Sequence, residues 1–197
     1  MVTKMDDLSQ NAIQIIERVK KIYDVENISF ISQNCIGGII YHDMEQKFLT
    51  PTINLYLMAN DFVKFVENLE YYLNQELIMI DGTEVVTGKI DDLEIYFLHY
   101  HSNEEALNKW NDRKQRINFE KIFVIQTDRD GFDDDTFTRF KRLPYPKALI
   151  TGNEKWKDEE FVIYLPQYKD DECIPDIIPE REFYKDDKII NLINKLK

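Results

Sequence analysis

Two aspartates directly follow KIFVIQT, an apolar and β-branched segment that is the clearest strand in the sequence. Asp128 and Asp130 are two residues apart in the motif DRDG, so in extended backbone both carboxylates project to the same side. Carboxylate oxygens are ligands that Mg²⁺ or Mn²⁺ accepts, and ligands of open α/β sheets bind at the carboxyl ends of strands. The motif therefore predicts a metal-diphosphate site, with Arg129 as a further substrate contact. The alternative is a strand-to-helix turn, whose geometry Asp and Gly supply.

A helix expected over residues 103–117 carries an arginine within its apolar stripe. At 100° per residue, Arg113 falls in the middle of this stripe, and Lys109 and Arg116 flank it. An inward guanidinium needs an anion or a carboxylate as its partner. Two interpretations stay open, namely a phosphate or carboxylate site on these three cations and a buried ion pair.

The chain has three histidines, and two of them are candidates for acid–base chemistry. His42 stands next to Asp43, and either side chain could act as a general base. His99 lies at the end of an expected strand, just before the basic helix, and is a candidate substrate contact. His101 follows with the alternation that puts both imidazoles on one face, but a histidine at a strand end is more often structural.

The stretch FISQNCIGGIIYHD combines a cysteine, a Gly-Gly pair and a histidine. We expect Gly37 and Gly38 to form a sharp turn after a strand, and Asn34 with the two glycine amides to hold a sugar or a phosphate. The glycine spacing matches neither the dinucleotide fingerprint nor the P-loop. Cys35 is expected to pack as a small apolar side chain, although a role as nucleophile with His42 would suit an acyl- or phosphotransferase.

Composition narrows the classes of function. A chain of 197 residues suffices for one well-buried core, and its net charge of −12 argues against nonspecific nucleic-acid binding. No apolar run approaches the roughly 20 residues that span a bilayer, so no integral membrane segment is expected. Residues 1–7 are polar and acidic, unlike a secretion signal. With only two cysteines and no Cys-x-x-Cys spacing, we expect a cytoplasmic protein with free thiols.

The elements alternate between helix and strand along the chain. The expected strands are NISFIS, TPTINLYLM, LIMI, a hairpin within EVVTGKIDDLEIYFLHY, KIFVIQT, KALIT and EFVIYLP. Helices are expected near residues 8–22, 60–73, 103–117, 133–143 and 186–197. This pattern predicts a single α/β domain over residues 1–197, with a parallel or mixed sheet and helices on both faces. Residues 168–188 are acidic and contain two prolines, so we expect them to wrap the surface.

Long motifs resemble a bacterial family of unknown function that is usually labelled exopolysaccharide biosynthesis protein. They are ISQNCIGGIIYHD, KFLTPTINLY, DFVKFVENLEYYL, LHYHSNEEALNKWNDRKQRIN and FVIQTDRDG. Gln33 and Thr50 depart from the family pattern, each as a polar replacement. The resemblance implies a role in capsule or lipopolysaccharide assembly and a glycosyltransferase-like enzyme.

Such an enzyme would bind a nucleotide-sugar diphosphate or another anionic small molecule and act on a polysaccharide acceptor. The alternative is a non-enzymatic protein of the same pathway that binds a carbohydrate or an anion.

Overall fold

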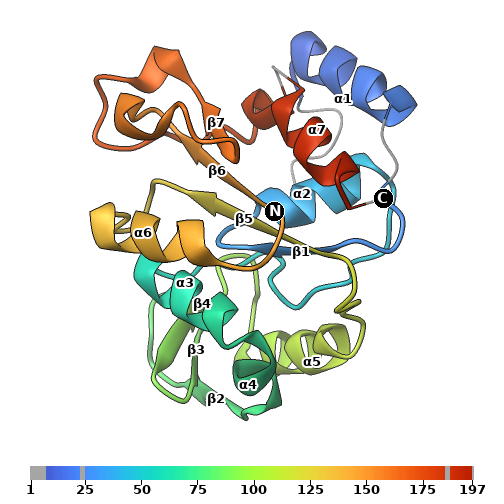
Figure 1. Ribbon diagram of the computed structural model, residues 1–197. Helices are drawn as coiled ribbons and strands as arrows, with labels where there is room; N and C mark the ends of the chain where they lie inside the picture. The colour runs from blue at the N-terminus through green and yellow to red at the C-terminus, as the bar shows by residue number, and fades with distance from the viewer. Residues whose placement is uncertain (1–7, 23–24, 185–186, 197) are drawn as a thin grey trace.

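The computed structural model describes residues 8–22, 25–184 and 187–196. The polar start expected at residues 1–7, and residues 186 and 197 at the bounds of the expected terminal helix, lie outside these ranges. A four-stranded parallel sheet forms the centre of the fold (Figure 1). Its strands, in spatial order, are β1 (Ser29–Ser32), β5 (Ile122–Thr127), β6 (Lys147–Thr151) and β7 (Val162–Tyr164).

The parallel sheet is buried on both faces, which explains why its strands read as continuous apolar runs. Successive side chains alternate between two hydrophobic cores. On β5, Phe123 and Ile125 enter one core, whereas Ile122 and Val124 enter the other. This two-sided burial confirms the predicted α/β class with helices on both faces.

Helices and a second sheet cover the two faces (Figure 1). One face carries α1 (Gln10–Ile22), α2 (Ile36–Asp43) and α7 (Lys188–Asn194). The other carries α3 (Ala59–Glu67), α4 (Leu69–Asn74), α5 (Asn103–Lys114) and α6 (Asp134–Arg142). Short 3₁₀ helices are η2 (Glu154–Trp156), η3 (Pro166–Tyr168) and η4 (Glu182–Tyr184).

The predicted hairpin forms a separate antiparallel sheet with the strand before it. This sheet has the order β2 (Leu77–Ile80), β3 (Thr87–Ile90) and β4 (Leu93–Tyr96). The turn falls at Asp91 and Asp92 as expected, with Asp91 in the left-handed region at φ 53°. By contrast, the strand expected in TPTINLYLM is wrong, since that segment makes only one isolated bridge, from Tyr56 to Tyr96.

Two further local predictions are also wrong. Gly37 and Gly38 do not form a turn but lie in the first turn of α2, where both are buried. A Cβ on Gly37 would come within 2.8 Å of the Cβ of Ser32, so glycine lets this helix approach β1 closely. The helix expected over residues 60–73 is interrupted at Asn68, which separates α3 from α4 at φ −129° and ψ 42°.

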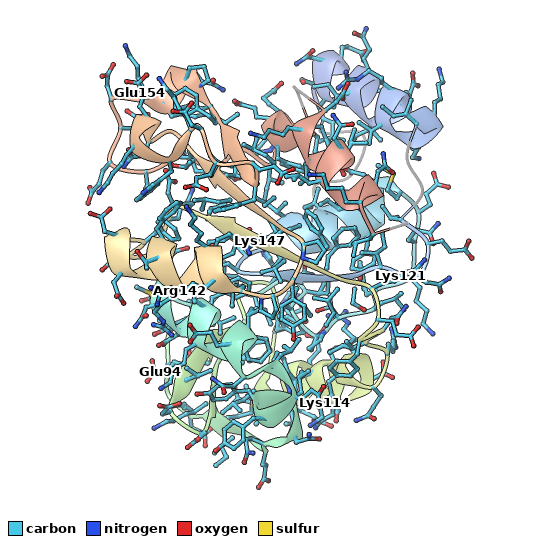
Figure 2. All side chains as sticks on the ribbon, viewed as in Figure 1. Glu94, Lys114, Lys121, Arg142, Lys147 and Glu154 are labelled. Atoms are coloured by element: carbon cyan, nitrogen blue, oxygen red, sulfur yellow. The ribbon has the colours of Figure 1, made fainter. Side chains whose placement is uncertain are left out.

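The helix ends agree with the chemistry of their sequences. The Ser102 hydroxyl accepts a hydrogen bond from the Glu105 amide, and the Glu105 carboxylate accepts one from the His101 amide. The bond to Ser102 is the N-cap half of a capping box, whereas the Glu105 side chain reaches the amide one residue before the cap. Charged side chains such as Glu94, Lys121 and Glu154 stand at the periphery of the molecule (Figure 2).

Candidate functional site

A cavity of about 490 Å³ opens at the carboxyl ends of β1 and β5. This volume is in the range of small-molecule sites, and the location is the one that ligands prefer in parallel α/β sheets. Its polar lining consists of Asn34, Cys35, Asn54, Tyr56, His99, Thr127, Arg129, Asp130 and Asp176. Its apolar lining consists of Ile36, Ile39, Leu98, Ile174, Pro175, Ile177 and Ile178.

A hydrogen-bonded network joins the two strand ends beneath this cavity. The Gln33 amide donates to the Leu57 carbonyl at 2.8 Å and to Asp130 Oδ2 at 2.7 Å. Its Oε1 accepts from Thr127 Oγ1 at 2.8 Å and from Asn34 Nδ2 at 3.1 Å. Because Gln33 is fully buried, these bonds hold Asn34, Thr127 and Asp130 in fixed positions.

Two residues of the cavity wall adopt left-handed backbone, namely Asn54 at φ 60° and Asp130 at φ 58°. This conformation is uncommon for non-glycine residues and is held here by its surroundings. The Asp130 carbonyl accepts a hydrogen bond from the Ala59 amide, and the Asn54 carbonyl accepts one from the His99 amide at 3.4 Å. Such constrained residues often occur at binding sites.

Asp128 has a structural position next to the cavity rather than in its wall. Its Oδ2 accepts from Thr151 Oγ1 at 2.6 Å and from the Gly152 amide at 3.2 Å. Its Oδ1 accepts from the Ile174 amide at 2.9 Å. Both oxygens are therefore occupied by donors, and the pairing of Asp128 with Asp130 on one cation does not fit this arrangement. Asp128 instead attaches residue 174 to the ends of β5 and β6.

Arg129 is the one arginine or lysine among the described residues that line the cavity. It is half-buried, and its Nη1 donates to the Ile174 carbonyl at a long 3.4 Å. A hydrogen bond of this length is weak, so the guanidinium can turn to an anion at small cost. This position agrees with the predicted role of Arg129 as a substrate contact, which stays a prediction.

The first turn of α2 supplies another part of the wall. Asn34 Oδ1 accepts from the Ile36 amide at 3.2 Å, so Asn34 closes the start of this helix while its side chain faces the cavity. Gly37 and Gly38 are not in the wall, since Gly37 packs on Ser32 and Gly38 on Ile53. Asn34 therefore lines the cavity, whereas neither glycine does.

Tyr56, in the loop before α3, and His99, in the turn after β4, also line the cavity. The Tyr56 ring stacks on Tyr96 with a centroid distance of 4.7 Å. Burial and the nearby Asp130 carboxylate raise the pKa of Tyr56, so the phenol stays protonated. Burial lowers the pKa of His99, which favours a neutral imidazole at pH 7. Both side chains can therefore donate and accept hydrogen bonds without carrying charge.

Cys35 also reaches the cavity, where it is half-buried. Burial raises the pKa of its thiol to about 11. Since the thiolate is the nucleophile, this environment does not activate Cys35. The position agrees with the expected packing role, although the side chain also contacts the space where a ligand would lie.

The basic helix does not reach the cavity. Lys109 is exposed, and Arg116 pairs with Asp112 one turn earlier on α5. Arg113 is buried, and its Nη1 donates to the Tyr100 hydroxyl at 2.6 Å. Its guanidinium also lies 5.1 Å from the ring centroid of Phe48. The sequence located the inward arginine correctly, but its partners are a phenol and an aromatic ring rather than a ligand in this cavity.

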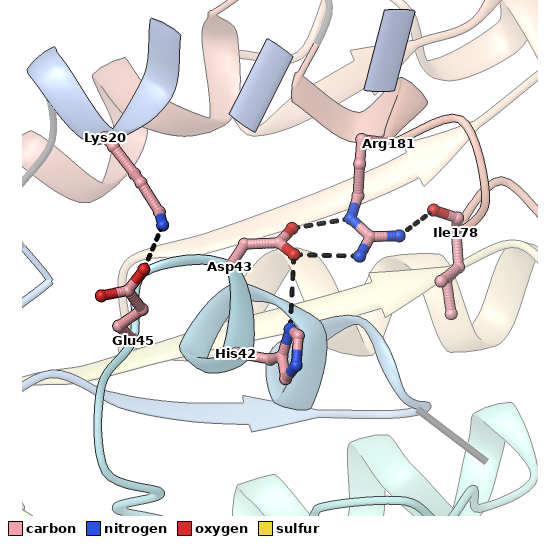
Figure 3. Close-up of polar contacts among 6 residues, drawn as sticks. All are labelled: Lys20, His42, Asp43, Glu45, Ile178 and Arg181. Carbon is pink, nitrogen blue, oxygen red and sulfur yellow. Dashed lines mark hydrogen bonds and ion pairs between the residues drawn. The ribbon is translucent and has the colours of Figure 1, made fainter. Parts of the chain in front are cut away.

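His42 and Asp43 lie at the opposite end of α2 from the cavity. The Asp43 carboxylate is buried and pairs with Arg181, while His42 Nδ1 lies 3.8 Å from Asp43 Oδ1 (Figure 3). Asn34, His42, Arg113 and Asp128 therefore do not share one cleft. Of these four residues, only Asn34 lines the cavity.

Sequence reasoning missed Asn54, Tyr56 and the wall at residues 174–178. Asn54 and Tyr56 lie in TPTINLYLM, whose pattern predicts a strand and gives no sign of a site. The prolines and acidic residues of the wall favour a surface segment and obscure the isoleucines between them. An apolar run that prolines keep out of regular structure was the available signal.

Within residues 8–22, 25–184 and 187–196, no group of three or more His, Cys, Asp or Glu side chains is arranged to hold a metal ion. Among the helices of those same ranges, none combines the length and apolar character needed to cross a bilayer.

Comparisons with known proteins cover nearly the whole chain. Residues 5–196 match the family described as domain of unknown function, DUF1919. A Haemophilus influenzae protein described as uncharacterized is 34% identical over 153 residues, which cover 77% of this chain and 74% of that protein. Staphylococcus aureus proteins named as HTH-type transcriptional regulators, from strains USA300 and N315 among others, are 23% identical over 175 residues, 83% of this chain and 90% of theirs. The chain therefore belongs to the DUF1919 family.

Proposed function

We propose that the cavity binds a sugar linked to a phosphate group, and that the protein is a glycosyltransferase-like enzyme of surface polysaccharide assembly. Nucleotide sugars, the donors expected from the sequence, share this sugar–phosphate chemistry with other activated sugars. One observation carries the proposal. A single arginine, a fixed carboxylate and several neutral polar side chains line one cavity at the carboxyl ends of parallel strands.

The phosphate would bind at Arg129, whose guanidinium offers several donors in one plane. The first turn of α2 borders the same cavity and adds the positive end of a helix dipole. The chain has a net charge of −12, so a local cation matters for drawing an anion to this site.

The sugar would bind among Asn34, Asn54, Tyr56 and Asp130. Amide side chains both donate and accept, which suits the hydroxyl groups of a sugar. Asp130 has one carboxylate oxygen held by Gln33, so the other oxygen can accept from a sugar hydroxyl. The phenol ring of Tyr56, supported by Tyr96, offers a flat apolar surface to the C–H face of the sugar.

In a transfer reaction, Asp130 would take the proton from the hydroxyl of the acceptor. The acceptor oxygen then forms a bond to the anomeric carbon, and the bond between this carbon and the phosphate oxygen breaks. The phosphate leaves with the electron pair, and Arg129 compensates its charge. No step is assigned to Mg²⁺ or Mn²⁺, because Asp128 is engaged with three donors and, of the two DRDG aspartates, only Asp130 lines the cavity.

The test is calorimetric titration with glucose 1-phosphate, galactose 1-phosphate and UDP-glucose, each with and without Mn²⁺. Arg129→Gln should weaken binding about 10- to 100-fold, the effect of removing a hydrogen bond to a charged group. Arg142→Gln is the matched control, since Arg142 is an exposed arginine at the end of α6. Absence of binding across the panel, or equal binding by both variants, would overturn the proposal.

A carbohydrate-binding protein without catalysis is the second candidate. The observation that favours it is the hydrogen bond that holds Asp130 to Gln33, an arrangement suited to recognition of a hydroxyl. Asp130→Asn separates the two candidates. In an enzyme, this variant binds the sugar phosphate but loses turnover, whereas a binding protein shows no turnover in either form.

Both candidates are placed in the cytoplasm, the compartment expected from the sequence. Cys35 and Cys173 are both free thiols, which supports a reducing environment.

A further inference from the structure

The cavity has a second, apolar part that the sugar and phosphate contacts leave unused. Five isoleucines face it, Ile36 and Ile39 from α2 and three from residues 174–178. Leu98 also lines the cavity and is 46% exposed, and Pro175 is exposed as well. A contiguous apolar lining that reaches the surface is typical of a site that meets an apolar ligand. The aliphatic lining thus continues from the buried wall to the rim.

This apolar wall is fixed at both ends. At its start, the Ile174 amide donates to the buried Asp128 carboxylate at 2.9 Å. At its end, the Arg181 guanidinium pairs with Asp43 and donates from Nη1 to the Ile178 carbonyl at 2.5 Å (Figure 3). The apolar surface is therefore already formed, and a ligand need not order it. Preformed sites of this kind bind with a smaller entropic cost.

We infer that the phosphate bound at Arg129 carries an aliphatic chain, which lies on the isoleucine wall and leaves the cavity past Leu98. The inference rests on the proposed function, because it assigns the other substituent of the same phosphate. An aliphatic chain needs no hydrogen-bond partners, and the wall offers methyl and methylene groups. The ligand is a phosphate ester of an aliphatic alcohol, with the sugar on the polar side.

A nucleoside fits this wall less well. The polar side chain among residues 174–178 is Asp176, and its Oδ1 already accepts from the Ile178 amide within its own turn. The polar edge of a nucleobase that is buried against isoleucines would lose hydrogen bonds to water without replacement. An alkyl chain binds favourably in the same place, and each methylene that is buried there raises the affinity about fourfold.

The test uses n-alkyl phosphates from methyl to octyl, with geranyl phosphate as the isoprenoid arm and uridine monophosphate as the nucleoside arm. Affinity is measured by calorimetry on the full chain, below the concentrations at which the longer compounds form micelles. We expect the affinity to rise about threefold to fourfold per methylene until the apolar part is filled. A preference for geranyl over octyl phosphate assigns an isoprenoid chain, and the reverse assigns a straight chain.

Leu98→Ser should weaken the binding of octyl phosphate about tenfold. Methyl phosphate should bind as before, since the removed side chain contacts only the alkyl group. The control is Ile78→Ser, which removes an aliphatic side chain that is 62% exposed on β2 and lies outside the cavity lining. Both positions are exposed, so folding is retained.

Equal affinity across the alkyl series would overturn the inference. Tighter binding of uridine monophosphate than of octyl phosphate would overturn it as well. Equal phosphate binding by the wild-type protein and Arg129→Gln would contradict the proposed function instead, so the two failures are distinguishable.

Discussion

The Asp43 carboxylate on α2 receives two hydrogen bonds from the Arg181 guanidinium, at 2.7 and 2.9 Å, across 138 residues of chain. Both side chains are buried, with exposed fractions of 2% and 0% (Figure 3). Arg181 adopts left-handed backbone at φ 54°, so the chain bends where the pair forms. The pair therefore anchors the end of the cavity wall at residues 174–178 to the helix that borders the same cavity.

Replacing Asp43 by Asn should destabilise the fold strongly. The substitution keeps the volume but leaves the Arg181 charge buried without its counterion, which costs about 3–5 kcal/mol. Urea unfolding followed by circular dichroism measures the loss.

Lys20→Met is the control for Asp43→Asn, because Lys20 forms an exposed ion pair with Glu45 at 2.6 Å near the same helix (Figure 3). Exposed pairs contribute about 0–1 kcal/mol. A loss in Asp43→Asn no greater than in this control would contradict the assignment of the buried pair as an anchor.

Gly37→Ala and Gly38→Ala should have opposite effects although the glycines are adjacent in α2. The new Cβ at residue 37 would lie 2.8 Å from the Cβ of Ser32, so the helix must move from β1, at a cost of about 1–3 kcal/mol. At residue 38 the nearest atom is 3.4 Å away on Ile53, which is close to ordinary contact. There, alanine favours the helix by about 0.5–1 kcal/mol.

Thermal unfolding of the two alanine variants decides this prediction. A higher melting temperature for the residue 37 variant than for the residue 38 variant would show that α2 does not pack on β1 as described.

These glycines also show where prediction from the sequence succeeded and failed. The alternation of helices and strands and the hairpin at Asp91 follow from local chemistry, and both are present. The Gly-Gly pattern predicts a turn, whereas Gly37 is needed for a close approach between α2 and β1, which is a tertiary contact. Local pattern carries no information about that contact.

The candidate site was also predictable only in part, because some of its residues depend on tertiary contacts. DRDG at the end of a buried strand directs attention to the correct edge of the sheet, and Arg129 and Asp130 do line the cavity. Asp128 differs because its three donors come from residues 151, 152 and 174, all distant in the sequence. The same holds for Arg113, whose partner hydroxyl on Tyr100 could not be inferred from helical periodicity.

Tyr100→Phe should destabilise the protein by about 1–3 kcal/mol, because two buried groups lose their partner. The Tyr100 hydroxyl donates to the Ile53 carbonyl at 2.8 Å and accepts from Arg113 at 2.6 Å. The control is Tyr96→Phe, whose hydroxyl donates to Glu94 in an exposed position. Urea unfolding should show a clearly smaller loss for the control, and equal losses would contradict the role of the buried hydroxyl.

His99 should titrate below the ordinary histidine pKa of about 6.5, since burial lowers its pKa. The sign for stability follows from proton linkage. When the pH falls below about 6.5, the unfolded chain takes up the proton first, so His99 destabilises the fold on acidification and has no such effect above that pH. Proton NMR of the imidazole measures the pKa, and comparison with His99→Asn identifies the resonance. A pKa at or above 6.5 would contradict the description of this side chain.

Cys35 should react slowly with iodoacetamide at pH 8. With a pKa raised to about 11 by burial, only about one thiol in a thousand is ionised at that pH, whereas an ordinary thiol near 8.5 is about one quarter ionised. The rate should rise with pH up to about 11, because only the thiolate attacks the reagent. Mass spectrometry of the Cys173→Ser variant isolates Cys35.

A sugar phosphate in the cavity should slow the reaction further, since Cys35 lines the same space. Rapid alkylation that does not depend on pH would show that the thiol is activated, and the cavity would then have to be considered as a nucleophile site.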